Sequence, residues 1–102
     1  MATELDAFRI KQLRRTILSN LNMLYPTGMR VGALYNTVSC QDETYDFTLF
    51  TKDVVYLKNK GYIRFPDEKL NLTKEFKEKI AILTEAGKDV ADMITIDPAL
   101  EV

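Results

Sequence analysis

A corner in the chain where a helix ends directly against a strand limits the possible folds more than any other feature. It lies in VVYLKNKGYIRF, residues 54–65. Apolar residues at helical spacing lead up to Leu57, and Asp46 is a suitable N-cap for this helix. Gly61 stops the helix, because glycine readily adopts the left-handed conformation that ends many helices. Residues 62–65 then have strand composition, so we expect a helix that turns sharply into a sheet.

Three further helices are expected around this corner. An amphipathic helix covers residues 5–25, a short second helix covers 30–40, and a closing helix begins after Thr84 and ends before Pro98. In the first helix, apolar residues recur at intervals of three and four, and the stripe is wider than one neighbouring layer requires. The members of this stripe are Phe8, Ile10, Leu13, Ile17, Leu18, Leu21, Leu24 and Tyr25.

The order of these elements indicates one fold. A second strand is expected in residues 78–84, which gives the order helix, helix, helix, strand, loop, strand, helix. This is the order of a winged helix-turn-helix domain. The predicted class is therefore α+β and mostly helical, with three helices, a two-stranded wing and a C-terminal helix. Length and composition fit a single domain over residues 1–102, with a core at about 8–94 and a tail at 95–102.

Charge is distributed unevenly along the chain. The formal net charge is −1, which argues against a dedicated nucleic-acid binder. Residues 1–40 nevertheless carry five basic and two acidic side chains, and residues 45–80 carry eight basic and six acidic ones. Residues 81–102 carry one lysine and five acids. An acidic C-terminal part therefore conceals a basic body that could meet DNA, although a solvated surface explains the same distribution.

Several function classes are disfavoured by composition. The chain has no histidine and a single cysteine, Cys40, so it lacks the usual ligands of a zinc site and the usual proton-transfer and nucleophilic arrangements. We expect no catalytic residues, no metal, no cofactor and no small-molecule substrate. No apolar run approaches the roughly 18 residues that cross a bilayer. With no secretory signal in its first residues, the chain is expected to be cytoplasmic, in a bacterial cell or a phage-infected host.

Two segments resemble a known family. DVVYLKNKGYI and AILTEAGKDV are similar to the paired signature of bacterial and phage winged-helix proteins of the broad MarR and PadR type, and the matching positions are Leu57, Gly61, Ile63, Leu83, Thr84 and Gly87. The stretch LTEAGKDVADMITIDPALEV resembles the ends of small winged-helix proteins of Mu-like prophages, although Met93 stands where those often have glycine. The resemblance covers roughly residues 10–98. It implies a DNA-binding protein of phage or mobile-element origin.

Two sets of side chains are candidate DNA contacts. In a winged helix the third helix lies in the major groove and the wing lies on the backbone or minor groove. The negative charge of Asp53 would repel DNA. Its spacing from Leu57, however, leads us to expect that its side chain points sideways and pairs with an arginine of the first helix. The recognition-helix candidates are Thr48, Thr51, Lys52, Val55, Tyr56 and Lys58, and the wing and edge candidates are Lys60, Arg64, Lys69, Lys74, Lys77 and Lys79.

The expected function is sequence-specific binding of double-stranded DNA by a transcriptional regulator. The alternative is a winged-helix protein-interaction module that does not bind DNA, because the same polar residues also make an ordinary solvated helix face. A homodimer is expected from the wide apolar stripe of the first helix and from apolar residues in DMITIDPALEV. In the competing arrangement this tail folds back on its own domain.

Overall fold

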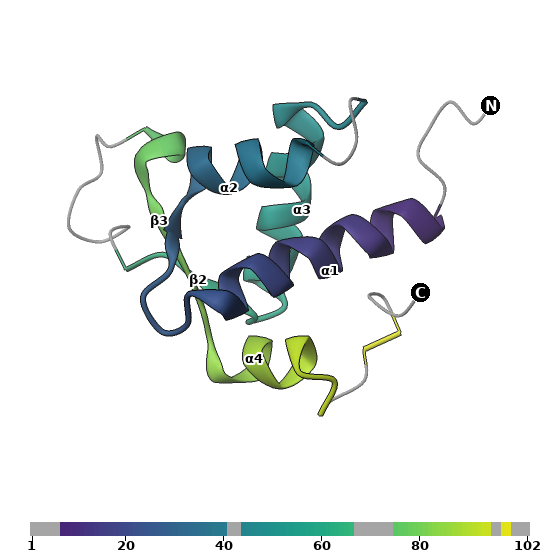
Figure 1. Ribbon diagram of the computed structural model, residues 1–102, viewed down its shortest axis with the longest axis vertical. Helices are drawn as coiled ribbons and strands as arrows, with labels where there is room; N and C mark the ends of the chain where they lie inside the picture. Colours follow the sequence, from purple (N-terminus) through teal and green to yellow (C-terminus); the bar gives the residue numbers. More distant parts are fainter. Residues whose placement is uncertain (1–6, 41–43, 67–74, 95–96, 99–102) are drawn as a thin grey trace.

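The computed structural model describes residues 7–40, 44–66, 75–94 and 97–98 (Figure 1). These residues form an α+β structure that is mostly helical, which confirms the predicted class at this level, and the arrangement is compatible with a winged-helix-like fold. In chain order the elements are α1 (Ala7–Met23), β1 (Met29–Arg30), α2 (Val31–Ser39), α3 (Phe47–Asn59), β2 (Ile63–Arg64), the 3-10 helix η2 (Phe76–Glu78), β3 (Ile80–Leu83) and α4 (Glu85–Ala91).

The sheet has three antiparallel strands in the order β1-β3-β2. Met29 of β1 pairs with Ala81 of β3, and Ile63 of β2 pairs with Leu83 on the other side. β1 is not predicted from the sequence, because two residues carry no recognisable period. It forms because β3 offers a second edge for pairing. The backbone hydrogen bond from Val31 N to Lys79 O, 2.9 Å long, continues this contact into the start of α2.

The core lies between the sheet and the first three helices (Figure 1). Both ends of the predicted apolar stripe on α1 differ from expectation, since Phe8 is 55% exposed and Leu24 is 39% exposed. Leu24 follows the last residue of α1, and Figure 1 shows the N-terminal end of α1 extending past its neighbours. The buried apolar residues of these three helices are those with the predicted spacing: Leu13, Ile17, Leu18 and Leu21 in α1, Val31, Leu34 and Val38 in α2, and Phe50, Val54 and Leu57 in α3.

The predicted corner at the end of α3 is confirmed. Gly61 has φ +86°, the left-handed conformation that lets the chain leave the helix. Its N–H donates to Lys58 O at 2.9 Å, and the N–H of Tyr62 donates to Leu57 O at 3.0 Å. These two bonds form a Schellman motif, which satisfies carbonyl groups that the end of a helix otherwise leaves unpaired. The chain therefore enters β2 in a direction set by backbone hydrogen bonds.

Helix α4 is shorter than predicted. Thr84 caps it as expected, because its Oγ1 accepts a 3.0 Å hydrogen bond from Gly87 N. The helix ends at Ala91, although the sequence pattern extends to residue 96. The reason is a left-handed turn at Met93, with φ +66°, in which Ile94 N donates to Asp89 O at 2.7 Å. Met93 thus occupies the left-handed position at the C-terminal end of a helix, where glycine is the commonest residue.

Helix α4 also packs closely on the corner through Gly87. A Cβ atom at this position would overlap the carbonyl oxygen of Tyr62 and would lie 2.8 Å from Leu83 Cδ1. The Thr84 hydroxyl reinforces the contact by donating to Gly61 O at 2.6 Å. Glycine is poor in helices, but here its missing side chain allows α4 to lie against the start of β2.

Gly87→Ala should therefore lower the free energy of unfolding by about 1–3 kcal/mol, although alanine raises intrinsic helix propensity. Urea denaturation followed by circular dichroism measures the change. Asp89→Ala, at an exposed position of the same helix, is the matched control and should change stability by less than about 0.5 kcal/mol. A Gly87→Ala protein as stable as the parent would contradict the close approach of α4 to Tyr62.

Candidate nucleic-acid interface

The outer face of α3 is polar and open to solvent, as predicted. Thr48 and Lys52 are exposed, Thr51 is partly exposed, and Val55 is 41% exposed. This face begins one residue after the helix start, where Asp46 Oδ1 accepts a 2.9 Å hydrogen bond from Leu49 N. The opposite face carries the buried residues of α3. The side chains of α3 are therefore divided between one face in the core and one face that a ligand can reach.

An ion pair attaches α3 to α1 on the inner side. Arg14 Nε donates to Asp53 Oδ1 at 3.0 Å, and the Tyr45 hydroxyl donates to Asp53 Oδ2 at 2.6 Å. Asp53 is 8% exposed, so both of its oxygens need such partners. This confirms the expectation that Asp53 points sideways and pairs with an arginine of the first helix. The carboxylate does not face the open side of α3.

The same network affects two aromatic residues. Burial, and then the hydrogen bond to Asp53, raise the pKa of Tyr45 far above its usual value, so the phenol remains a proton donor. The Arg14 guanidinium also lies 3.8 Å from the centroid of the Tyr56 ring. One face of Tyr56, a recognition-helix candidate, is therefore already covered by an arginine. Lys58, another candidate, is partly exposed.

The predicted edge residues lie in different places. Arg64 on β2 and Lys77 in η2 are exposed, and Lys79 is partly exposed. The Lys77 ammonium lies 4.8 Å from the centroid of the Phe47 ring, which places η2 beside the first turn of α3. Lys60, at the C-terminal cap of α3, forms a 3.2 Å ion pair with Asp97. The wing candidates Lys69 and Lys74 fall outside the described residues.

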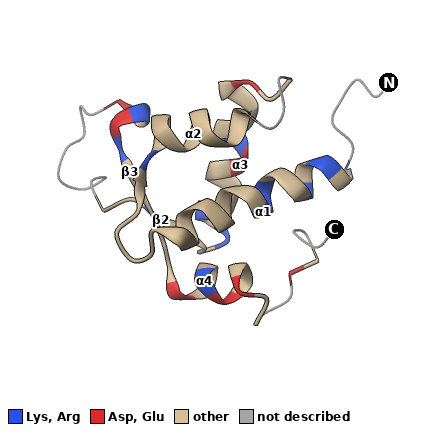
Figure 2. Ribbon diagram, in the orientation of Figure 1, with Lys and Arg blue, Asp and Glu red and all other residues tan. Residues whose placement is uncertain are grey.

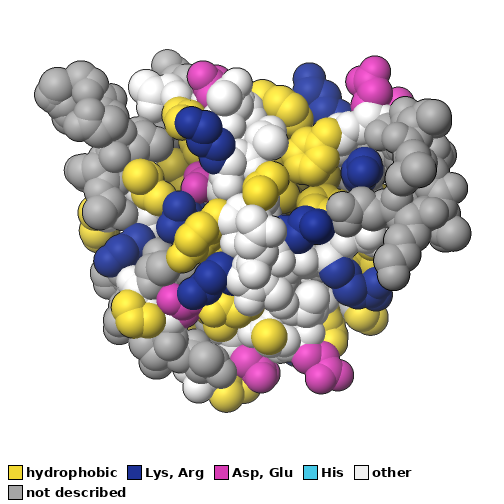
Figure 3. Space-filling view, turned by 180° about the vertical axis from the view of Figure 1, so that it is seen from behind, with side chains coloured by type: hydrophobic (Ala, Val, Ile, Leu, Met, Phe, Trp, Pro, Cys, Tyr) yellow, Lys and Arg dark blue, Asp and Glu magenta, His cyan; other side chains and the backbone are white. Residues whose placement is uncertain are grey.

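Charge is distributed unevenly over the molecule. Figure 2 shows basic residues along α1 and near the sheet, and acidic residues on α4, which also carries a lysine, as well as at η2. The view from behind in Figure 3 shows lysine and arginine side chains spread over the central part of one face, with most acidic side chains toward its margins. The described acids of α4 and its cap are Glu85, Asp89 and Asp92. The uneven charge found along the sequence is thus also uneven in space.

Four residues with contacts in this region were not predicted as site residues: Arg14, Tyr45, Tyr62 and Asp97. Arg14 follows the buried Leu13 in α1, and its position in the helical pattern does not distinguish it from the other arginines of that helix. The pairing of Asp97 with Lys60 joins residues far apart in sequence. The helical and strand periodicity of the sequence gives no information about contacts of this kind.

The part of the chain that the structure describes holds neither a candidate metal-binding cluster nor a membrane-spanning helix. Within residues 7–40, 44–66, 75–94 and 97–98, no group of three or more acidic or cysteine side chains could hold a metal ion. None of the helices formed by these residues is long and apolar enough to cross a membrane. No family model, curated protein or solved structure matches the chain. Its function must therefore be argued from its own residues.

Breaking the inner network should destabilise the protein without touching the outer face of α3. We expect Tyr45→Phe to cost about 1–3 kcal/mol, because it removes a hydrogen bond to a buried charge. Asp53→Asn should cost about 2–4 kcal/mol, since it leaves Arg14 without its ionic partner. Urea unfolding checks both values, with the exposed Lys52→Gln as a control expected within about 0.5 kcal/mol of the parent. Equal stability of all four proteins would show that the network is not formed.

Proposed function

We propose that this chain is a small winged helix-turn-helix protein that binds double-stranded DNA in a sequence-specific way. Helix α3 would lie in the major groove, and the segment between β2 and β3 would act as the wing on the phosphate backbone. The observation that carries the proposal is the open polar face of α3, which is held from behind by the Arg14–Asp53 pair and bordered by basic side chains. The element order and the β1-β3-β2 sheet support the same reading.

The residues of the α3 face suit both parts of DNA recognition. Lys52 can neutralise a phosphate or donate to a base edge, and Thr48 and Thr51 can bond bases or contact the thymine methyl group. Val55 adds an apolar side chain of the kind that also meets thymine methyls. Lys77, next to the first turn of α3, is placed to bind the backbone beside the groove. Recognition of bases by α3 and binding of the DNA backbone by η2 would thus come from adjacent elements.

The proposed biological role is that of a cytoplasmic transcriptional regulator of phage or mobile-element origin, of the MarR and PadR type, which acts without cofactor or catalysis. The second candidate is a protein-interaction module. One observation favours it: Met23, Met93 and Ile94 are 82%, 54% and 72% exposed. Large apolar side chains at that exposure mark contact surfaces when they are contiguous. The two functions differ sharply in how binding depends on salt.

The first test compares two variants that lower the net charge by one. Lys52→Gln should weaken binding to a random duplex about 5- to 20-fold at low salt, because one phosphate or base contact is lost. Ala86→Glu, on the exposed surface of α4, is the matched control and should change affinity less than about twofold. Fluorescence anisotropy at two salt concentrations measures both. Equal affinities for the two variants would favour the protein-interaction module.

Thr48→Ala and Thr51→Ala extend this test to specificity. Each should change preference among duplexes selected from a random pool by about 1–3 kcal/mol, because base readout is lost. Affinity for random DNA should remain nearly that of the parent. Loss of affinity for all duplexes alike would place these threonines on the backbone and not on the bases.

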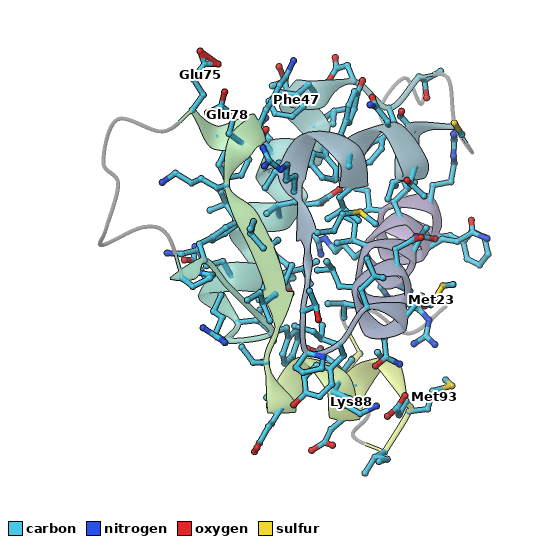
Figure 4. The ribbon with its side chains drawn as sticks, turned by 60° about the vertical axis from the view of Figure 1, so that its left-hand side comes forward. Met23, Phe47, Glu75, Glu78, Lys88 and Met93 are labelled. Carbon is cyan, nitrogen blue, oxygen red and sulfur yellow. The ribbon has the colours of Figure 1, made fainter. Side chains whose placement is uncertain are left out.

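We further propose that the protein is a homodimer that uses the apolar patch Met23, Met93 and Ile94. Figure 4 shows Met23 and Met93 on the same edge of the molecule, although they come from the end of α1 and the turn after α4. The two helices are joined there by the hydrogen bonds from Asn22 to Asp92 and from Lys88 to Asn22. A two-fold dimer could set two α3 helices about one DNA turn apart.

Sedimentation at tens of micromolar tests this proposal. Met23→Lys should convert a dimer into a monomer, because it places a charge in the apolar contact. Ala33→Lys, at an exposed position of α2, is the matched control and should leave the dimer intact. A parent protein that sediments as a monomer would remove the dimer from the proposal but would leave DNA binding by single copies unaffected.

A further inference from the structure

A carboxylate of the C-terminal segment is bound at the end of α3. Asp97 Oδ2 accepts a hydrogen bond from the Tyr62 hydroxyl and lies 3.2 Å from Lys60 Nζ. The Asp97 side chain is 7% exposed, whereas that of Lys60 is 39% exposed. An anion is therefore held by a cation and a phenol in a site that is partly closed to water. Burial, and then this hydrogen bond, raise the pKa of Tyr62 to about 12, so the phenol keeps its proton.

This anion site lies at the C-terminal cap of α3 and is linked to the inner network through the Tyr56 ring. Lys60 Nζ lies 6.0 Å from the ring centroids of both Tyr56 and Tyr62. Tyr56 in turn carries the Arg14 guanidinium on its ring. Cationic and aromatic side chains therefore alternate from α1 to the start of β2. Such a row has the composition of a surface that follows a phosphate backbone.

The core does not need Asp97 to stay in place. The described buried hydrophobic residues extend along the chain as far as Val90, and Asp97 follows the end of α4 by several residues. The ion pair with Lys60 and the hydrogen bond from Tyr62 are polar contacts, and neither of them buries those core residues. The segment that carries Asp97 is also the most acidic part of the sequence, with five acids after residue 80.

We propose that Lys60 and Tyr62 form a binding site for a DNA phosphate, and that Asp97 occupies this site as an internal competitor when DNA is absent. The proposal rests on the proposed function, DNA binding through α3. A carboxylate and a phosphodiester each present two oxygens that share one negative charge, so the same ammonium and hydroxyl donors suit both. The two anions cannot share the Lys60 ammonium without repulsion. DNA binding would therefore displace Asp97 from Lys60 and Tyr62, and Asp97 would weaken DNA binding.

Asp97→Asn is the decisive variant because the inference predicts a gain. It should raise affinity for a random duplex about 3- to 10-fold at low salt and steepen the slope of log K against log salt by about one, since one more lysine reaches phosphate. Asp89→Asn removes the same charge from an exposed position of α4 and is the matched control. It should change affinity less than about twofold and leave the slope unchanged. Circular dichroism confirms that each variant is folded.

A double variant tests whether the gain passes through Lys60. In a Lys60→Gln background, Asp97→Asn should no longer raise affinity or change the salt slope, because the cation it would release is gone. A gain that survives in this background would overturn the inference, as would equal behaviour of Asp97→Asn and Asp89→Asn. If the parent protein binds DNA and Lys52→Gln weakens that binding, either of these results would rule out Asp97 as a competitor and leave the proposed DNA binding intact. If neither the parent nor Asp97→Asn binds any duplex, the proposed function falls as well.

Discussion

The pair of charges between Arg14 and Asp53 determines how α3 is presented. A carboxylate that is 8% exposed would be costly without donors, and here the two donors come from α1 and from Tyr45, which precedes α3. Burial of Phe50, Val54 and Leu57 sets which face of α3 lies in the core, and the hydrogen bonds at 3.0 and 2.6 Å add directional contacts on the flank of that face. Together they hold the rotation of α3 about its own axis. With that rotation held, Thr48 and Lys52 face outward.

The corner at Gly61 sets the second relation, between α3 and the sheet. The Schellman bonds define the direction of the chain, the Thr84 hydroxyl binds Gly61 O, and Gly87 allows α4 to approach Tyr62. The contact between Thr84 and Gly61 joins residues that lie 23 positions apart in the sequence. In the antiparallel pair, β2 starts and β3 ends at this corner, so η2, which precedes β3, lies at the other end of the strands. Lys77 of η2 lies over the Phe47 ring, so that end of the hairpin meets the start of α3.

Local signals in the sequence were sufficient for most of the fold and for the open face of α3. Asp46, Thr84 and Gly61 each act within a few residues of their own position, so the caps and the corner could be read directly. The two-residue β1 could not, because its existence depends on an edge of β3 about fifty residues later. The early end of α4 depends on backbone geometry at Met93 that side-chain periodicity does not report. Of the candidate site, exposure could be predicted, whereas the partners of Lys60 and Tyr56 could not.

The location of acids matters more here than their number. At physiological salt the screening length is about 8 Å, so acids on α4 have little effect on a phosphate bound at the outer face of α3. Asp53 is close to α3, but Arg14 compensates its charge internally. Asp97 differs from both, because it lies at the end of α3 and pairs with a partly exposed lysine. Under the proposed function, Asp97 would be the acid that competes with a phosphate for Lys60. A protein of this kind can bind a polyanion while the chain as a whole is acidic, provided that this one carboxylate can be displaced.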